Sequence, residues 1–164
     1  MTPFTIASLD KLGRDAIALG ARYSVGKKGE LFFDGIVFTL LSERHGRFVR
    51  QWKLPVLKNQ KRAVRIDFKE RHKNGAVIEF ASRAKAGTEL GATQNRSEIR
   101  KLLRASAARM RVLLLLDPSS RPPLQRSELA EEYQSLPLGK GRRNQFAIRV
   151  IYVRAGHGFN FVWH

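Results

Sequence analysis

The chain contains no cysteine, which excludes disulfide bonds and thiolate metal sites and makes a reducing cytoplasm the expected location. It also lacks any apolar run close to the roughly 20 residues that a membrane-spanning helix needs. The N-terminal segment 1–15 does not have the charged-then-apolar layout of a secretory signal. We therefore expect no membrane partner, and the length of 164 residues indicates a single domain over residues 1–164.

Acidic residues are scarce, since 14 Asp and Glu stand against 31 Lys and Arg and give a net charge of +17. The excess is concentrated in three segments. Residues 41–73 hold eleven basic and three acidic residues, residues 96–111 hold six and one, and residues 140–154 hold five and none. Basic residues gathered in this way are typical of a surface that binds a polyanion, and nucleic acid is the default partner.

The periodicity of apolar residues predicts the elements. Steps of three and four predict an amphipathic helix over 8–23, and segment 30–41 is interpreted as a strand with Gly35 as a bulge. A basic loop, a hairpin over 64–83, a helix over 95–106 and a buried strand over 110–116 follow. A helix from about Ser127 and strands over 146–153 and 159–163 complete the order. This order predicts an α/β fold in which helices flank a central mixed β-sheet.

The expected loops carry most of the candidate contacts to nucleic acid, because flexible cationic side chains in loops can reach a phosphate backbone. One aromatic residue, Trp52, lies among them and has two interpretations, a stacking platform for a base or an anchor of the core beneath the loop. The basic candidates are Arg44, Arg47, Arg50, Lys58, Lys61, Arg62, Lys140, Arg142 and Arg143.

Three carboxylates, Asp67, Glu70 and Glu79, lie on the predicted hairpin around Asn74-Gly75. A two-residue loop would place Glu70 opposite Glu79, whereas a three-residue loop would place Lys69 opposite Glu79 and put Asp67 on the same face. Adjacent carboxylates need a cation between them, either a divalent ion or an arginine. With a neighbouring ammonium group, such a pair suits metal-dependent chemistry on a phosphodiester.

Glu79 is the unusual member of this group, because it interrupts the apolar stretch Val77-Ile78-Glu79-Phe80. A carboxylate in such a strand must be paired, hydrogen-bonded or bound to metal. A functional role and a structural salt bridge to Arg65, Arg83 or Arg100 both remain open at this stage.

An Asp on one strand, a short hairpin, a Glu on the next strand, a helix and a buried apolar strand together resemble the core of the PD-(D/E)XK nuclease-like superfamily. The resemblance covers about residues 30–116 and implies a restriction-endonuclease-like core, a Mg²⁺ or Mn²⁺ cofactor and a preference for DNA over RNA. It matches Asp67 and Glu79 to the family's carboxylates. The family's lysine would stand at Ala81, so Lys69, Arg83 or Lys85 would have to supply the cation from a shifted position.

These observations lead to three functional hypotheses. The first is a nucleic-acid-binding protein with a nuclease-like core and basic loops that contact the phosphate backbone. The second is a metal-dependent endonuclease in which Asp67 and Glu79 act with Lys69, and in which Glu70 is a further candidate metal ligand. The third is a basic interaction subunit of a protein or ribonucleoprotein assembly. The sequence predicts no particular oligomeric state.

Overall fold

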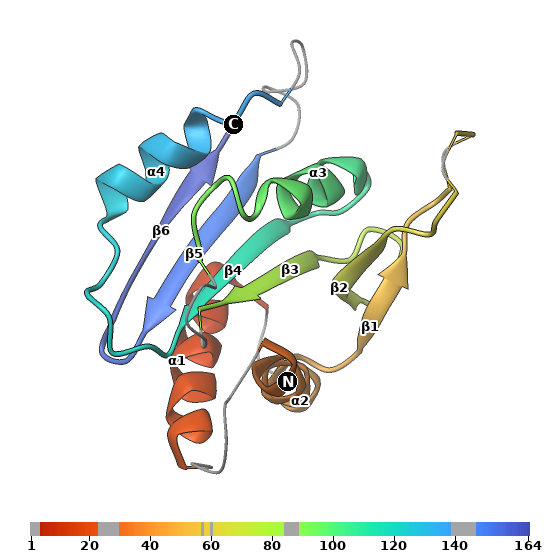
Figure 1. Cartoon of the computed structure of the whole chain (residues 1–164). Helices are drawn as coiled ribbons and strands as arrows, with labels where there is room; N and C mark the ends of the chain where they lie inside the picture. Colours follow the sequence, from red (N-terminus) through yellow and green to blue (C-terminus); the bar gives the residue numbers. More distant parts are fainter. Residues whose placement is uncertain (1–3, 23–29, 57, 60, 84–88, 139–146) are drawn as a thin grey trace.

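The computed structural model describes residues 4–22, 30–56, 58–59, 61–83, 89–138 and 147–164 (Figure 1). It has an α/β fold in which four helices flank a six-stranded mixed sheet, as the sequence predicts. None of the helices in the described ranges is both long enough and apolar enough to cross a membrane. The elements are α1 (Ile6–Arg22), α2 (Glu30–His45), β1 (Phe48–Lys53), β2 (Arg65–Glu70), β3 (Val77–Ser82), α3 (Arg96–Arg104), β4 (Arg111–Asp117), α4 (Arg126–Gln134), β5 (Ile148–Arg154) and β6 (His157–Trp163).

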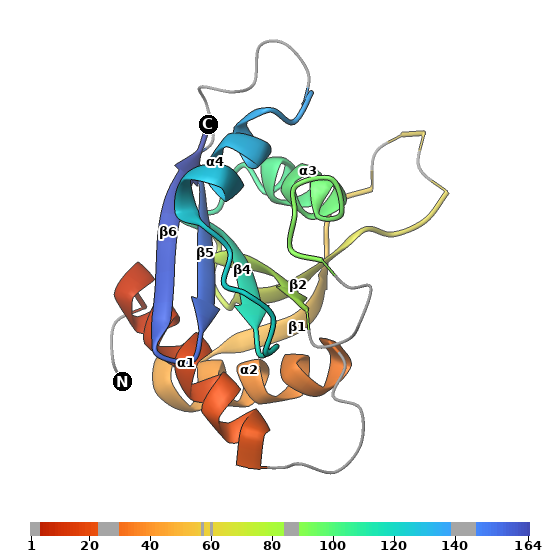
Figure 2. The same ribbon diagram turned by 60° about the vertical axis from the view of Figure 1, so that its left-hand side comes forward.

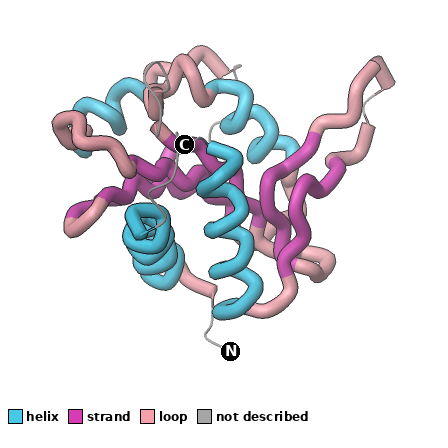
Figure 3. The backbone as a smooth tube through the Cα atoms, turned by 60° about the horizontal axis from the view of Figure 1, so that its bottom comes forward, coloured by secondary structure: helices cyan, strands magenta, loops and turns pink. Residues whose placement is uncertain are grey.

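The strands lie in the sheet in the order in which they occur in the chain. Strands β1, β2 and β3 form an antiparallel meander, β3, β4 and β5 are parallel, and β6 returns antiparallel to β5. Helices α1 and α2 cover one face of the sheet, and α3 and α4 cover the other (Figures 2 and 3). The fold therefore has three layers, and each face of the sheet has its own hydrophobic core.

Strand β4 lies at the centre of both cores. Val112, Leu114 and Leu116 pack toward α1 and α2, whereas Leu113 and Leu115 pack toward α3 and α4. A strand covered on both faces needs apolar residues at every position instead of at alternate ones. The continuous run of leucines in the sequence thus correctly predicts a buried strand.

The prediction of a strand over residues 30–41 is wrong, because this segment forms helix α2. Its fully or nearly buried side chains, Phe33, Val37, Leu40 and Leu41, recur at the spacing of one helical face. Additional apolar residues at Ile36 and Phe38 obscured this period in the sequence. Gly35 consequently lies inside a helix and forms no β-bulge.

The prediction of one long basic loop is also wrong, because the loop contains strand β1, which pairs with β2 at the edge of the sheet. Arg50 and Trp52 lie on this strand, and Arg44 lies on α2. An edge strand needs apolar residues only where it packs against the core. Charged residues on such a strand prevent edge-to-edge association with another sheet. The charges that suggested a loop are therefore compatible with a strand.

A buried ion pair joins the ends of β3 and β4. The guanidinium Nη2 of Arg83 lies 2.7 Å from Asp117 Oδ2 and also donates a hydrogen bond to the carbonyl oxygen of Pro122. The Tyr152 hydroxyl and Ser119 Oγ donate hydrogen bonds to the same carboxylate. Burial acts to raise the pKa of Asp117, but the hydrogen bonds from Arg83, Ser119 and Tyr152 and the charge of Arg83 together outweigh it, and the net pKa lies below its ordinary value.

Candidate functional site

The carboxylates on β2 and β3 meet in a register that neither predicted loop length gives. Lys69 pairs with Val77 and Phe68 pairs with Ile78, so the next position places Asp67 beside Glu79. The loop covers residues 71–75, and the backbone N–H of Glu70 donates to the carbonyl of Ala76. The two predicted registers, with Glu70 or Lys69 opposite Glu79, are both wrong because the Asn-Gly pair ends a longer loop. The carboxylate of Glu70 stabilises that loop by accepting a hydrogen bond from the Ala76 N–H.

Asp67 and Glu79 each bond to the backbone of the other strand. Asp67 Oδ2 accepts from the N–H of Phe80 at 2.9 Å, and Glu79 Oε1 accepts from the N–H of Asp67 at 3.3 Å. On the other side, Gln51 Nε2 donates to Asp67 Oδ1 at 3.1 Å. Side chains thus replace regular ladder bonds at this point of the sheet.

The backbone is irregular at the same place. Gln51, which is opposite Asp67, has a φ of 52°, a left-handed conformation that costs a residue other than glycine about 1–3 kcal/mol. On one side of Gln51, Phe48 of β1 and Phe68 of β2 pack toward α2. On the other side, Trp52 of β1 and Ile66 of β2 pack toward α3, so the side chains change faces at this point. Strained conformations of this kind cluster at functional sites, which makes the surroundings of Asp67 a candidate.

Lys101 of α3 completes the site. Its Nζ lies 2.8 Å from Glu79 Oε2, and the Glu79 side chain is fully buried while that of Lys101 is 24% exposed. The partner of Glu79 is therefore not Arg65, Arg83 or Arg100. We call Asp67, Glu79 and Lys101 the carboxylate–lysine cluster. The sequence held one signal for this role of Lys101. Lys101 precedes Leu102, a buried residue of an amphipathic helix, which places the lysine near the edge of the buried face.

The shifted cations expected from the resemblance lie elsewhere. Lys69 Nζ donates to the carbonyl oxygens of Glu70 and His72, at 3.0 and 2.7 Å. Arg83 is bonded to Asp117, as described above. Lys85 lies outside the described residues. Among the described residues, Lys101 alone forms an ion pair with Glu79.

Burial and mutual repulsion control the electrostatics of the cluster. Burial, followed by the neighbouring charge of Asp67, raises the pKa of Glu79 to about 8. Burial likewise raises the pKa of Asp67, although the Phe80 N–H partly opposes this. For Lys101, burial acts to lower the pKa, but the ion pair with Glu79 outweighs it and the net pKa is raised. Two carboxylates beside one ammonium group favour the approach of a further cation.

The raised pKa of Glu79 predicts a pH-dependent stability. The folded value of about 8 exceeds the ordinary value of 4.5, so between these limits the folded state binds a proton that the unfolded state lacks. The free energy of unfolding should therefore fall as pH rises through this window, by at most about 1.4 kcal/mol per pH unit. Urea unfolding at several pH values in the presence of EDTA measures the slope. Glu79→Gln should flatten it, and parallel profiles for both proteins would contradict the assignment.

Two carboxylates are the protein contribution that Mg²⁺ usually needs, because water and phosphate oxygens supply its other ligands. Asp67 and Glu79 fit this requirement. Glu70 does not join them, since it is bonded to Arg109 at 2.8 Å and to the β2–β3 loop. Within the described ranges, no group of three or more His, Cys, Asp and Glu residues is arranged to hold a metal ion.

Residues 47–73 form a surface that we call the basic arm. It consists of strands β1 and β2, the connection between them and the first residues of the β2–β3 loop. It holds ten basic and two acidic residues, and the described parts of its β1–β2 connection project from the edge of the sheet (Figures 1 and 2). Its cations with exposed side chains and no carboxylate within ion-pair distance, as far as the described residues extend, are Arg47, Lys53, Lys58, Lys61, Arg62, Arg65, Arg71 and Lys73.

The remaining basic candidates are placed differently. Arg44 lies on α2 and pairs with Asp15 of α1 at 2.7 Å. Arg50 lies on the arm but forms an ion pair with Asp34 of α2. Lys140, Arg142 and Arg143 lie outside the described residues. Lys58, Lys61 and Arg62 therefore lie in the β1–β2 connection, Arg47 lies at the other end of β1 beside Arg71, and Arg44 is directed toward a helix.

Acidic side chains gather at the other end of the sheet. Glu128, Glu131 and Glu132 are exposed on α4, which packs against β6, whereas the arm begins at β1. Among the described residues, the charge is thus more positive on the arm than on α4, which would direct a polyanion toward the arm. No family model, curated protein or solved structure matches this chain.

Proposed function

We propose that this protein binds the phosphate backbone of nucleic acid through the basic arm, with DNA preferred over RNA. The observation that carries the proposal is the row of exposed arm cations that have no carboxylate partner among the described residues. Such side chains exchange condensed counterions for phosphate contacts, which is the main source of backbone affinity. The acidic helix α4 at the opposite edge supports this orientation.

Binding through the arm should depend steeply on salt. For duplex DNA, each neutralised phosphate contributes about 0.9 to the slope of log K against log salt concentration. Changing Lys58, Lys61 and Arg62 together to Gln should reduce that slope by roughly 2 to 3 and weaken binding. Fluorescence anisotropy with a labelled duplex at several salt concentrations measures both effects.

A control with the same change in net charge separates the arm from general electrostatics. Lys11, Arg14 and Arg22 lie on α1, and the first two pair with acidic residues of the same helix. Their replacement by Gln should leave the slope nearly unchanged. An affinity of the wild type that does not respond to salt would contradict backbone binding and favour an interaction subunit that docks on an acidic protein or a ribonucleoprotein.

The carboxylate–lysine cluster supports a second candidate function, metal-dependent cleavage of phosphodiesters. Lys101 supplies an ammonium group beside Glu79, where Ala81 cannot. The order of a helix, three strands, a helix and a strand, with Asp67 on β2 and Glu79 on β3, further supports the PD-(D/E)XK nuclease-like assignment. The cluster shares strand β2 with the basic arm, so a backbone bound by the arm would pass close to it.

In this candidate reaction the residues of the cluster and their neighbours have different roles. Asp67 and Glu79 would hold Mg²⁺ or Mn²⁺, which when bound supplies Lewis acidity at a phosphoryl oxygen. Gln51 and the Phe80 N–H fix the orientation of Asp67 through their hydrogen bonds. Lys101 would keep positive charge next to the scissile phosphate. Metal-dependent cleavage by the wild type, and its loss in Glu79→Gln, is the test.

A further inference from the structure

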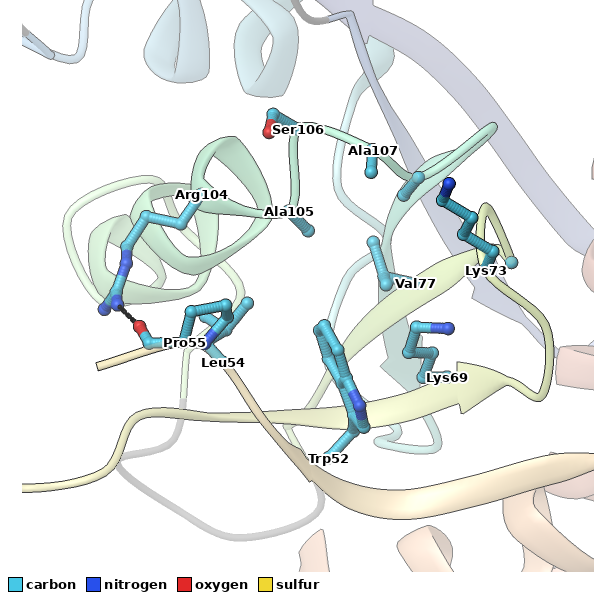
Figure 4. A pocket seen from close by; sticks show the side chains of 12 residues that line it. Trp52, Leu54, Pro55, Lys69, Lys73, Val77, Arg104, Ala105, Ser106 and Ala107 are labelled. Carbon is cyan, nitrogen blue, oxygen red and sulfur yellow. Dashed lines mark hydrogen bonds between the residues drawn. The ribbon is translucent and has the colours of Figure 1, made fainter. Parts of the chain in front are cut away.

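A pocket of about 130 Å³ lies between the C-terminal end of α3 and strands β1, β2 and β3 (Figure 4). Its walls are apolar where Leu54, Val77 and Ala105 line it, and the indole of Trp52 forms one side. Three cations, Lys69, Lys73 and Arg104, also line it, and none of its lining residues is acidic. The combination of an aromatic wall, apolar contacts and positive charge selects a flat ligand that carries negative charge.

The groups around Trp52 are held in place. Lys69 Nζ lies 5.1 Å from the centre of the indole ring and donates hydrogen bonds to two backbone carbonyls. Arg104 Nη2 donates to the carbonyl of Pro55 at 2.8 Å, and the two cations lie on opposite sides of Trp52 in Figure 4. Because both cations donate these bonds to neutral carbonyl oxygens and not to carboxylates, their charge is available to an anionic ligand.

The pocket adjoins the carboxylate–lysine cluster along three elements. Lys101 and Arg104 lie one turn apart on α3, Asp67 and Lys69 are two residues apart on β2, and Val77 and Glu79 are two residues apart on β3. Residues at these spacings share a face of their helix or strand, apart from the irregularity at Asp67. A ligand in the pocket would therefore lie next to the cluster.

We propose that this pocket holds one unpaired nucleobase of a nucleic-acid strand, stacked on Trp52, with the adjoining phosphates near Lys69, Lys73 and Arg104. The inference rests on the proposed function, since it specifies which form of nucleic acid the protein selects. The pocket is well below the roughly 300–1,000 Å³ that drug-sized ligands occupy, so its size suits a single base better than a base pair. The preferred substrate is a single strand, a strand end or an unpaired base within a duplex.

The test compares binding of a single-stranded oligonucleotide with binding of a blunt duplex that contains the same sequence. Trp52→Ala should weaken single-strand binding by roughly 5- to 150-fold, the range that base–aromatic stacking gives, and leave duplex binding nearly unchanged. Trp52→Phe keeps an aromatic face and should retain most of the affinity. Thermal unfolding of each variant shows whether it is folded.

Fluorescence gives a second readout. The chain has 2 tryptophans, and Trp163 is buried beneath α4 with its indole N–H bonded to the carbonyl of Tyr133. Stacking of a base should therefore quench the emission of Trp52, and Trp52→Phe should abolish the quenching while it still binds the strand. Trp163 serves as the internal reference.

The outcomes separate the inference from the function on which it rests. Binding to neither oligonucleotide would overturn the proposed function itself. Salt-dependent binding to both forms, without quenching and with no effect of Trp52→Ala, would overturn the base pocket and leave backbone binding in place. Equal quenching by the blunt duplex would also overturn it.

Discussion

If the carboxylate–lysine cluster is catalytic, the wild-type protein will cleave DNA in the presence of Mg²⁺ or Mn²⁺, and Glu79→Gln will lower the rate by roughly a hundredfold or more. The amide keeps the volume of the fully buried side chain but removes the negative charge that a divalent cation requires. Asp67→Asn should act in the same way. Conversion of supercoiled plasmid to nicked and linear forms, with EDTA as a blank, measures the rate.

Variants of Lys101 distinguish a catalytic role of the cluster from a purely structural ion pair. Lys101→Met should also lose cleavage, because among the described residues its ammonium group, paired with Glu79, is the only positive charge that forms an ion pair with either carboxylate of the cluster. Lys101→Arg keeps the charge and should recover part of the rate. Binding of DNA by all these variants should stay close to that of the wild type, since the basic arm is intact.

Glu70→Gln is the matched control. Glu70 is a carboxylate on the same strand as Asp67, but it is bonded to Arg109 and the β2–β3 loop instead of the cluster. The variant should therefore cleave at the wild-type rate after correction for any loss of stability. Absence of cleavage by the wild type, or equal cleavage by Glu79→Gln, would remove the enzyme hypothesis and leave backbone binding as the function.

The second large effect concerns stability. Arg83→Met should lower the free energy of unfolding by about 3–5 kcal/mol, because the fully buried Asp117 carboxylate loses its nearer ionic partner and keeps, among the described residues, only Arg154, at 3.8 Å. Tyr152 and Ser119 still donate hydrogen bonds to Asp117, so we expect the lower part of this range. Urea unfolding at neutral pH, followed by circular dichroism, gives the value.

Arg121→Met provides the surface control for this experiment. Arg121 pairs with Glu89 at 2.8 Å, close to the 2.7 Å of Arg83 and Asp117, but both side chains are substantially exposed, and such pairs contribute about 0–1 kcal/mol. If the two variants lose equal stability, the buried network is not the source of the effect. Adding Asp117→Asn to Arg83→Met should recover part of the loss, because it removes the unpaired charge.

Much of the fold followed from local patterns. The amphipathic period of α1, the leucine run of β4 and the apolar alternation around the β2–β3 hairpin each report the environment of their own segment, and a central strand must be apolar on both faces. The prediction failed at α2, where extra apolar residues hid the helical period, and at β1, where the charges of an edge strand resembled a loop.

The sequence by itself determined the excess of positive charge on residues 41–73, the absence of cysteine, and the presence of a carboxylate, Glu79, within an apolar strand, because charge and burial preference are properties of the residues. Only the tertiary structure decided that Asp67 lies beside Glu79 and that Lys101 is the cation between α3 and β3. A register depends on the full geometry of a loop, and contact between residues 22 positions apart depends on how a helix packs on the sheet. Neither is encoded in the spacing of residues along the chain.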